Sequence, residues 1–336
     1  MTTPTELSPR PVAVIGAGVA GLTAARTLSE LGREVVVFDK GRGPGGRVSS
    51  RRAEPFAFDH GAQYFTARDP RFQETVNAWL ESGDVRRWDG GIVALAEDGE
   101  SSVREGTERF VGVPHMNQVA KALAEGLDVR TTTRIASLSR DDSGWHLTST
   151  EDERFGPFSQ LLVTAPPDQA ADLIADHSKA GSQLREIPMA PCWAVLLGFE
   201  TRVEVDFDGA FCDSPELAWI CRNSSKPGRP AAESWVLHAT SEWSLDRIGH
   251  DRSEIIHDLT AAVERITGRA WPRAVHEDAH FWRYSRPAVT LDHKVLVDEG
   301  CSLAIAGDAY TGGRVEGAYV SGLSAAQWLA RAGAPR

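Results

Sequence analysis

The segment Val12-Ala13-Val14-Ile15-Gly16-Ala17-Gly18-Val19-Ala20-Gly21 is a short apolar run that ends in three glycines spaced as GxGxxG. Residues 22–31 then favour a helix, so the segment predicts a strand, a tight turn and a helix. Gly16 permits the turn, Gly18 allows a pyrophosphate to approach the backbone, and Gly21 lets the helix pack closely on the strand. The helix N-terminus offers free N–H groups to phosphates. This predicts a dinucleotide-binding unit.

A second apolar run, residues 34–38, ends at Asp39. An acid at this point accepts hydrogen bonds from an adenosine ribose. Residues 40–47 follow with four glycines and three cations, which suits either a solvated loop or a backbone cradle for an anion. The position directly after Asp39 favours the cradle. Neither feature distinguishes NAD from FAD.

Composition limits the classes of partner. The 336 residues are enough for two domains, and 36 basic against 47 acidic residues give a net charge of -11. This charge argues against non-specific binding to nucleic acid or to an anionic membrane. The longest apolar stretch, residues 192–199, is shorter than the roughly 20 residues of a membrane helix. Residues 1–10 lack the apolar core of a signal peptide, so we expect a cytoplasmic protein that binds small molecules.

The cysteines show no metal-binding spacing. The four of them, at 192, 212, 221 and 301, form no CxxC pair. We therefore predict no metal site and interpret the cysteines as small buried hydrophobic residues.

Periodicity predicts helices at residues 71–82, 114–125, 168–175 and 253–267, and strands at residues 129–138, 144–150 and 158–164. From about residue 180 to 285 the pattern becomes alternating, which indicates a mostly antiparallel second domain. This region holds six tryptophans, at 193, 219, 235, 243, 271 and 282. Each one alone suits core packing, whereas the set together suits a cleft for a planar heterocycle.

The C-terminal segment indicates which dinucleotide binds. Residues 302–306 predict a buried strand, which leads into Gly307-Asp308 and a helix at residues 318–330. Asp308 is placed to accept a hydrogen bond from a sugar hydroxyl, and the helix N-terminus faces a second electron-rich group. A ligand held at both ends of the chain is long, which favours FAD with its flavin on residues 307–318.

The combination of the glycine motif, Asp39, Gly45-Gly46-Arg47 and Gly307-Asp308 resembles the flavin-containing amine oxidase superfamily. Within it, several stretches resemble the bacterial renalases, namely residues 38–40, 59–68, 222–227, 237–241 and 313–318. The resemblance implies an α/β, two-domain FAD-dependent oxidoreductase. A glutathione-reductase-like Rossmann domain for FAD would comprise residues 11–68, 114–166 and 286–336. A mostly antiparallel, amine-oxidase-like substrate domain would comprise residues 69–113 and 167–285.

The resemblance also implies an activity. Renalases oxidise the 2-dihydro and 6-dihydro isomers of NAD(P)H to NAD(P)+, and O2 reoxidises the flavin to give H2O2. Covalent flavin attachment in related proteins uses a cysteine near the C-terminal motif. No cysteine occurs in residues 308–318, so we expect non-covalent FAD. Hydride transfer from a dihydropyridine needs no general base, only a donor carbon placed close to flavin N5 and a dry site.

The expected site residues fall into three groups. Those for FAD are Gly16, Gly18, Val19, Ala20, Gly21, Asp39, Lys40, Gly46, Arg47, Gly61, Ala62, Ile135, Gly307, Asp308, Gly313, Arg314, Val315, Glu316 and Ala318. Those for substrate are Gln63, Tyr64, Phe65, Thr66, Ala67, Trp219, Arg222, Trp282, Tyr284 and Arg286, with the two arginines as candidates for substrate phosphates. Asn223 and His238 are the candidate catalytic residues, although His238 equally suits an ordinary strand histidine.

Two other activities remain open at this point. An amine oxidase would hold a neutral amine in an aromatic cage, which the tryptophans can supply. A non-enzymatic flavoprotein would sense redox state or light through a partner, but the sequence shows no appended output domain. A flavin monooxygenase is disfavoured because the chain has no second GxGxxG motif for NADPH. We expect a monomer.

Overall fold

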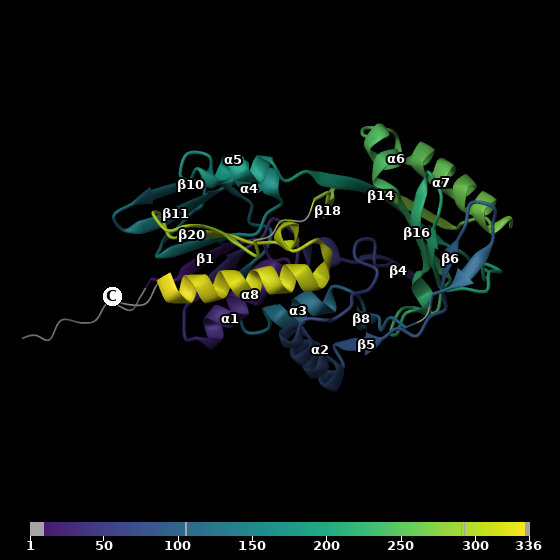
Figure 1. Cartoon of the computed structure of the whole chain (residues 1–336), viewed down its shortest axis with the longest axis horizontal. Coiled ribbons are helices and arrows are strands. Elements are labelled where there is room, and N and C mark those ends of the chain that lie inside the picture. Colours follow the sequence, from purple (N-terminus) through teal and green to yellow (C-terminus); the bar gives the residue numbers. More distant parts are fainter. Residues whose placement is uncertain (1–9, 105, 290, 292, 333–336) are drawn as a thin grey trace, which may run out of the picture.

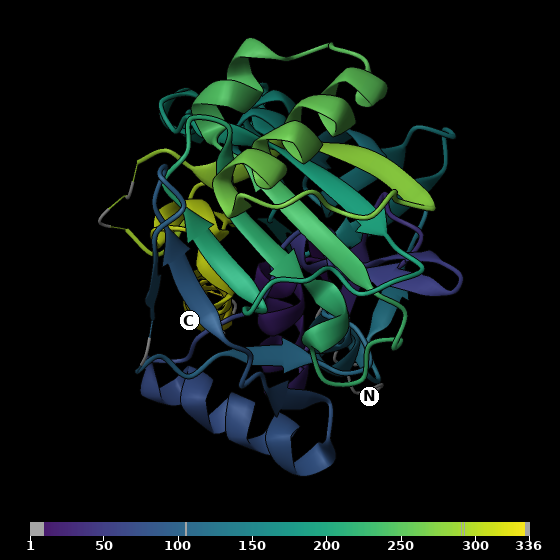
Figure 2. The same cartoon turned by 90° about the vertical axis from the view of Figure 1, so that its right-hand side faces the viewer.

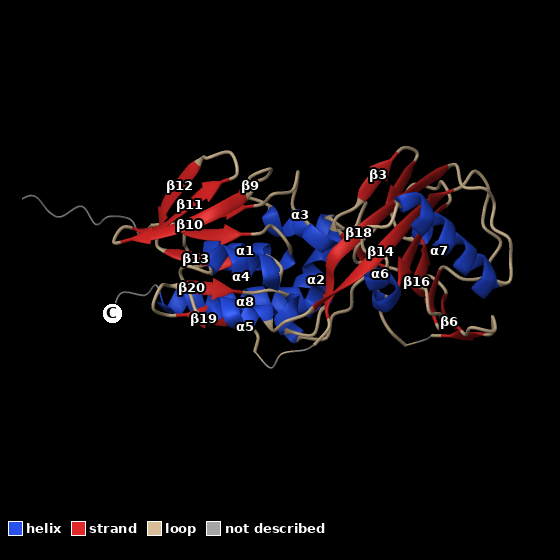
Figure 3. Ribbon diagram, turned by 90° about the horizontal axis from the view of Figure 1, so that it is seen from above, coloured by secondary structure: helices blue, strands red, loops and turns tan. Residues whose placement is uncertain are grey.

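The computed structural model describes residues 10–104, 106–289, 291 and 293–332. Two layered bodies lie side by side along the longest axis of the molecule (Figure 1). Each body is built on one large β-sheet, and Figure 3 shows the two sheets next to each other. The expectation for the first ten residues falls mostly on residues 1–9, outside the described residues.

The first sheet has the order β19-β20-β13-β1-β2-β9 and is parallel except for β19. Its strands are β1 Val12–Ile15, β2 Val35–Phe38, β9 Asp128–Arg130, β13 Gln160–Val163, β19 Leu296–Asp298 and β20 Leu303–Ile305. All four residues of β1 are buried, and they alternate between two hydrophobic clusters on opposite faces of the sheet. A strand buried on both faces has this continuous apolar sequence.

Different elements cover the two faces of this sheet. On one face lie α1 Val19–Glu30, α2 Pro70–Ser82, α3 Gln118–Ala124 and α8 Arg314–Ala332, whose buried side chains form one cluster. On the other face lie α4 Pro167–Ile174, α5 Ala180–Arg185 and the antiparallel strands β10 Ile135–Asp141, β11 Gly144–Ser149 and β12 Arg154–Phe158.

The second sheet has the order β18-β14-β17-β16-β15-β6-β7 and is antiparallel except for the β15–β6 pair. Its strands are β6 Ile92–Leu95, β7 Ser101–Val103, β14 Met189–Gly198, β15 Gly209–Cys212, β16 Leu217–Arg222, β17 Ser234–Ala239 and β18 His276–Pro287. The helices α6 Ser241–Asp246 and α7 Arg252–Thr267 pack on it and lie in front of it in Figure 2. The predicted antiparallel second domain is confirmed.

Small elements join the two bodies. They are the hairpin β3 Arg51–Ala53 and β4 Phe56–Phe58, the pair β5 Val85–Arg87 and β8 Phe110–Gly112, and the short 3-10 turns η1 Gly46–Val48, η2 Asn223–Ser225 and η3 Asp308–Tyr310. None of the helices within the described residues is long and apolar enough to cross a membrane.

Several expected elements need correction. Residues 129–138 form two strands in different sheets, β9 and β10, because the chain turns at residues 131–134. The helix predicted at 114–125 begins only at Gln118, and the helix predicted at 318–330 begins earlier, at Arg314. Likewise α1 begins at Val19 instead of residue 22, and β12 lies in a stretch where no strand was expected.

The domain boundaries also shift. Residues 69–113 were assigned to the substrate domain, but α2 buries Phe72, Val76 and Trp79 in the cluster of α1 and α8. Likewise α4 and α5, within the segment 167–285, pack against the parallel sheet. Packing partners that are distant in sequence determine these memberships, and periodicity does not reveal them.

Candidate functional site

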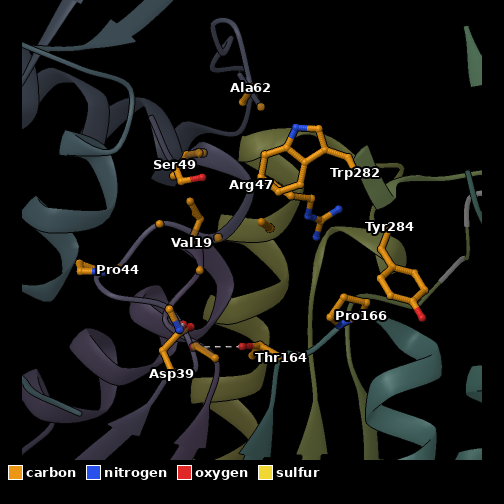
Figure 4. A pocket seen from close by; sticks show the side chains of 18 of the residues that line it. Val19, Asp39, Pro44, Arg47, Ser49, Ala62, Thr164, Pro166, Trp282 and Tyr284 are labelled. Carbon is orange, nitrogen blue, oxygen red and sulfur yellow. Dashed lines mark hydrogen bonds between the residues drawn. The ribbon is translucent and has the colours of Figure 1, made fainter. Parts of the chain in front are cut away.

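A cavity of about 1760 Å³ runs along the C-terminal ends of β1, β2 and β13 and continues between the two bodies. In the order of the first sheet, β1 lies between β2 and β13, so the chain crosses to opposite sides at this point. Ligands of open α/β sheets bind at such switch points. Figure 4 shows the cavity with side chains from both ends of the chain around it.

The glycine motif has the expected geometry. Gly16 has a φ of +112°, and its N–H donates to the carbonyl oxygen of Phe38 at 2.8 Å. A methyl group on Gly18 would meet nothing within 4 Å, so this glycine faces open space in the cavity, whereas one on Gly21 would collide with the carbonyl oxygen of Gly16. Gly21 therefore packs helix on strand and does not line the cavity, which corrects its assignment as a cofactor contact.

Asp39 holds the turn and the following loop together. Its carboxylate accepts hydrogen bonds from the N–H groups of Ala17 and Gly41, both at 2.6 Å. The loop itself is tied to the motif by the N–H of Gly45, which donates to the Ala17 carbonyl oxygen at 2.9 Å. Asp39 lines the cavity while organising its walls.

The C-terminal motif meets the same loop. Arg47 donates two hydrogen bonds to Asp308, at 2.9 and 2.6 Å, although 261 residues separate them. Asp308 is 6% exposed. Its carboxylate was expected to bind a sugar hydroxyl, but the structure shows that both its oxygens already accept from an arginine.

At the junction between the two bodies, the cavity wall is aromatic. Trp219, Trp282, Tyr64 and Tyr284 line it, and Trp282 and Tyr284 project from β18 in Figure 4. The other tryptophans of the set, at positions 193, 235, 243 and 271, belong to the core beneath α6 and α7. Two of the six tryptophans therefore line the cavity, and the other four pack in the core.

Three histidines stand beside these aromatic rings. His60, His238 and His280 line the cavity, and burial is the main cause that lowers the pKa of His60 to about 3 and those of His238 and His280 to about 4. The carbonyl oxygen of His60 lies 3.0 Å from Nε2 of His238 and 2.9 Å from Nε1 of Trp282. A carbonyl can only accept, so Nε2 of His238 carries its proton. At neutral pH all three imidazoles are uncharged.

Charge in the cavity is opposite in sign to the charge of the chain. Among the described residues, its lining contains ten cations, namely Lys40, Arg42, Arg47, Arg51, Arg52, Lys121, Arg134, Arg283, Arg286 and Arg314, and three acids, namely Asp39, Asp172 and Asp308. The whole chain carries a net charge of -11. The cavity thus attracts anions.

The structure removes two residues from the predicted catalytic and substrate sets. Arg222 is 2% exposed and pairs with Glu233 at 2.6 Å, so it is not available to substrate phosphates. Asn223 is 1% exposed, and its side chain bridges the carbonyl oxygen of Ala57 and the N–H of Asp59. Neither residue lines the cavity, because β16 and η2 turn both side chains inward.

Five further expected residues also lie outside the cavity. Phe65 belongs to the hydrophobic cluster of α1, α2 and α8, and Ala67 packs against that cluster. Thr66, between them in the sequence, does not line the cavity either. Glu316 instead accepts from the N–H groups of residues 68 and 69, and Gly313, with a φ of +79°, shapes the turn before α8. The other predicted cofactor and substrate residues, and His238, line the cavity.

Sequence reasoning missed a buried ionic cluster beside the cavity. Asp59 is 1% exposed and accepts from Arg229 at 2.6 Å and from Lys226 at 3.4 Å. Lys226 also donates to Gln63 at 3.0 Å. The carboxamide nitrogen of Gln63 donates to Asp59 and Gly61, so this side chain fixes the loop rather than facing substrate freely. Asp59 and its two cations come from segments far apart in the chain, and single buried charges of this kind produce no apolar periodicity in the sequence.

Thr164, His60 and His280 were also missed as lining residues. Thr164 donates to the carbonyl oxygen of Ile15 at 3.0 Å and so stands under the glycine turn. The sequence could have indicated Thr164, because it ends the predicted strand at residues 158–164 just before Pro166-Pro167. Cys192 lines the cavity too, and burial raises the pKa of its thiol to about 12.

These residues fit FAD. Methyl groups on Gly18, Gly43 and Gly307 would meet no atom within 4 Å, so the cradle is open to a ligand backbone at both ends. The N-terminus of α1 has no side-chain cap, which leaves its N–H groups for a phosphate. Val315 and Ala318 of α8 line the second end. Among the described residues, no group of three or more His, Cys, Asp or Glu is arranged to hold a metal ion.

Comparisons with known proteins agree with this geometry. The family described as "NAD(P)-binding Rossmann-like domain" matches residues 14–79, and the family described as "Flavin containing amine oxidoreductase" matches residues 94–330. A 4,4'-diapophytoene desaturase (4,4'-diaponeurosporene-forming) of Staphylococcus aureus (strain Newman) is 46% identical over 50 residues. That match covers 15% of this chain and 10% of the desaturase.

Solved structures share the fold. A candidate protoporphyrinogen oxidase from Exiguobacterium sp. 255-15 superposes with a TM-score of 0.75 at 14% identity, covering 97% of this chain and 99% of the other. Wild-type putrescine oxidase bound to putrescine has a TM-score of 0.67 at 14% identity, with coverage of 96% and 99%. At these identities the likeness concerns the fold alone.

Proposed function

The chain belongs to the flavin containing amine oxidoreductase family, and from that premise we propose a specific activity for it. The protein oxidises the 2-dihydro and 6-dihydro isomers of NAD(P)H to NAD(P)+ with non-covalently bound FAD. In the complete turnover the donor loses a hydride and O2 takes up two electrons and two protons to become H2O2. When bound, FAD supplies the hydride acceptor and the site of reoxidation.

One observation carries this proposal: among the residues that the structure describes, the junction wall combines Trp282 and Tyr284 with three uncharged imidazoles and no acid. A dihydropyridine is neutral and planar, so aromatic walls can hold it and exclude water. Its oxidation leaves a cation, which aromatic faces stabilise. The reaction needs no general base. The three imidazoles, with their lowered pKa values, are weak bases and suit a reaction of this kind.

The surrounding residues have defined tasks in this proposal. The hydrogen bond from Nε2 of His238 to the His60 carbonyl oxygen fixes the imidazole ring. The other ring nitrogen, Nδ1, carries no proton and can accept a hydrogen bond from the substrate. Trp282 is held by the same carbonyl, so its ring has one orientation. The buried Lys226 fixes Gln63 and thereby the loop that carries His60. Gly16, Gly18, Arg47 and Asp308 would hold the cofactor.

Oxidation of an amine is the second candidate, favoured by the family and by the aromatic junction. Ten cations in the cavity lining disfavour it, since most amines are protonated in solution and would be repelled. The third candidate function is that of a flavin-binding protein that senses redox state or light and catalyses no reaction.

We also propose that the protein acts as a monomer in the cytoplasm, with dihydropyridine and O2 as its only reactants.

Anaerobic stopped-flow bleaching of the bound flavin near 450 nm distinguishes these functions. We expect fast bleaching by the 2-dihydro and 6-dihydro isomers, none by 4-dihydro-NADH or by amines, and peroxide when O2 is admitted. Bleaching by an amine alone would assign the chain to amine oxidation. If no donor bleaches the flavin, the enzymatic proposal is wrong.

A further inference from the structure

Residues 57–63 contact both the side chains of the cavity and the buried ionic cluster of Asp59. On the cavity side, the carbonyl oxygen of His60 lies 3.0 Å from Nε2 of His238 and 2.9 Å from Nε1 of Trp282. Both of these side chains line the cavity, and they belong to different strands, β17 and β18. One main-chain carbonyl therefore holds two side chains at the junction of the two bodies.

The other carbonyls of this segment are bound by two buried amides. The side-chain amide of Asn223, which is 1% exposed, donates to the carbonyl oxygen of Ala57 at 2.7 Å. The side-chain amide of Gln63, which is 6% exposed, donates to the carbonyl oxygens of Asp59 and Gly61, the latter at 3.2 Å. Carbonyls 57, 59 and 61 thus bind to the protein interior, and the carbonyl between the last two is left for the cavity.

We propose that Asn223 and Gln63 are positioning residues for the reaction. By holding the alternate carbonyls, the two amides direct the carbonyl of His60 at His238 and Trp282. The inference rests on the proposed function for its effect on the reaction rate, whereas the positioning of the two side chains needs no substrate. It gives Asn223 a task although this residue does not line the cavity.

A buried ammonium group determines the orientation of both amides. Nζ of Lys226 lies 3.0 Å from Oε1 of Gln63 and 3.1 Å from Oδ1 of Asn223. An ammonium group only donates, so both amide oxygens face it and both NH2 groups face the main-chain carbonyls. The side chain of Lys226 is 0% exposed, and its third acceptor is Asp59 at 3.4 Å. Its three donors are therefore used inside the fold.

The segment is also packed tightly against the cofactor loop. The N–H of Ala62 donates to the carbonyl oxygen of Arg47 at 2.9 Å. A methyl group on Gly61 would collide with that carbonyl oxygen and would lie 3.3 Å from the ring of Trp282. The main chain thus passes between the cofactor loop and Trp282 at contact distance, so a rotated peptide at residue 60 would displace groups on both sides.

The direction of the His60 carbonyl decides which nitrogen of His238 can serve the substrate. Because a carbonyl only accepts, it keeps the proton of the neutral imidazole on Nε2 and leaves Nδ1 as an acceptor. Without this bond, His238 would populate both tautomers and Trp282 would lose its fixed orientation. A misplacement of reacting atoms by about 1 Å costs about a hundredfold in rate.

The first test locates the proton of His238 by 15N NMR of FAD-loaded protein with labelled histidine, and the spectrum of His238→Gln assigns the signal. We expect the Nε2-protonated form alone in the wild type, and both tautomers in Gln63→Met and in Asn223→Leu, which each lack the amide donor. Gln73→Met is the matched control and should match the wild type, because its exposed amide donates to the carbonyl of Ala67, outside the segment.

Two outcomes of this test would overturn the inference. One is a mixture of tautomers in the wild type, a result that depends on no variant. The other is the Nε2-protonated form alone in both folded variants. Gln63→Glu, which keeps an oxygen for Lys226 but lacks the amide donors, takes the place of Gln63→Met if that variant does not fold.

The second test measures the rate. We expect the limiting rate of anaerobic flavin bleaching by the 6-dihydro isomer of NADH to fall about tenfold or more in Gln63→Met, with unchanged FAD content and with Gln73→Met like the wild type. A merely structural role predicts lower stability with a wild-type tautomer and rate. A wild-type rate in a variant that shows both tautomers would also overturn the inference. If no donor bleaches the wild-type flavin, the proposed function fails, and the NMR result still decides whether the two amides position His238.

Discussion

The guanidinium of Arg47 donates two hydrogen bonds to the carboxylate of Asp308, at 2.9 and 2.6 Å. The first residue belongs to the loop after β2, and the second opens the turn before α8. This pair closes the cofactor end of the cavity from opposite ends of the chain. Its two parallel bonds give a fixed geometry that a single charge contact does not.

Arg47→Ala should lower the free energy of unfolding of the apoprotein by about 1–2 kcal/mol, because Asp308 keeps its buried charge without a partner. Because the arginine is partly exposed, the loss stays below the roughly 3–5 kcal/mol of a fully buried pair. Urea unfolding measures it. Arg185→Ala, which breaks an exposed pair with Asp172, should change stability little. Additive losses in a cycle of Arg47→Ala and Asp308→Asn would contradict the coupling.

The buried Asp59 should make the fold acid-sensitive. Burial alone would raise the pKa of Asp59, but Lys226, Arg229 and hydrogen bonds outweigh burial and hold it well below its usual range. A depressed carboxyl pKa stabilises the fold above the unfolded value of about 4, and this contribution is lost as the pH falls further. Asp59→Asn should weaken that dependence in unfolding experiments between pH 5 and 2. A wild-type slope in the variant would refute the assignment.

Asp59→Ala tests the same cluster at neutral pH. It leaves two cations without their carboxylate in a dry site, since the side chains of Lys226 and Arg229 are both 0% exposed. We expect a loss of about 3–5 kcal/mol. Asp246→Ala, on the short helix α6, is a surface control and should cost far less.

Two glycines of one motif should respond differently to the same change. Gly18→Ala keeps an allowed backbone, with φ of -81°, and meets no atom. It should cost about 1 kcal/mol or less of stability, but its methyl group occupies the cradle and should weaken FAD binding about tenfold or more. Gly21→Ala collides with the Gly16 carbonyl and should cost about 3 kcal/mol. Thermal unfolding and FAD titration separate the two, and equal effects would contradict these roles.

The three cavity histidines should add a second pH dependence, above that of Asp59. In the unfolded chain histidine takes up a proton near pH 6.5. In the fold, burial lowers the pKa of His238 to about 4. The unfolded state therefore binds more protons between these values, and stability falls as the pH is lowered from 6.5 to 4. His238→Gln should reduce this slope, by up to about 1 kcal/mol per pH unit. The exposed His257→Gln is the control, and an unchanged slope in His238→Gln would be evidence against a neutral buried imidazole.

Sequence reasoning located the cofactor end of the site well. Gly16, Gly18 and Gly307 act through backbone geometry, and Asp39 acts through a carboxylate placed directly after β2. Residue type and spacing encode both features directly. It failed for Arg222 and Asn223, because a strand pattern does not tell which face of β16 lies on the core. The opposite error hid Arg51, His60 and His280, which reach the cavity only because the β3 hairpin packs beside β18.

The sequence by itself determined the βα dinucleotide motif, the two-domain α/β class and the strand that leads into Gly307-Asp308 and the C-terminal helix. Each of these depends on local backbone preference and apolar periodicity. Only the tertiary structure decided which tryptophans face the cavity, which charges are buried at Asp59, and that Arg47 meets Asp308. These are contacts between segments far apart in the chain. Their energies come from desolvation and packing, which depend on the neighbours that folding brings together.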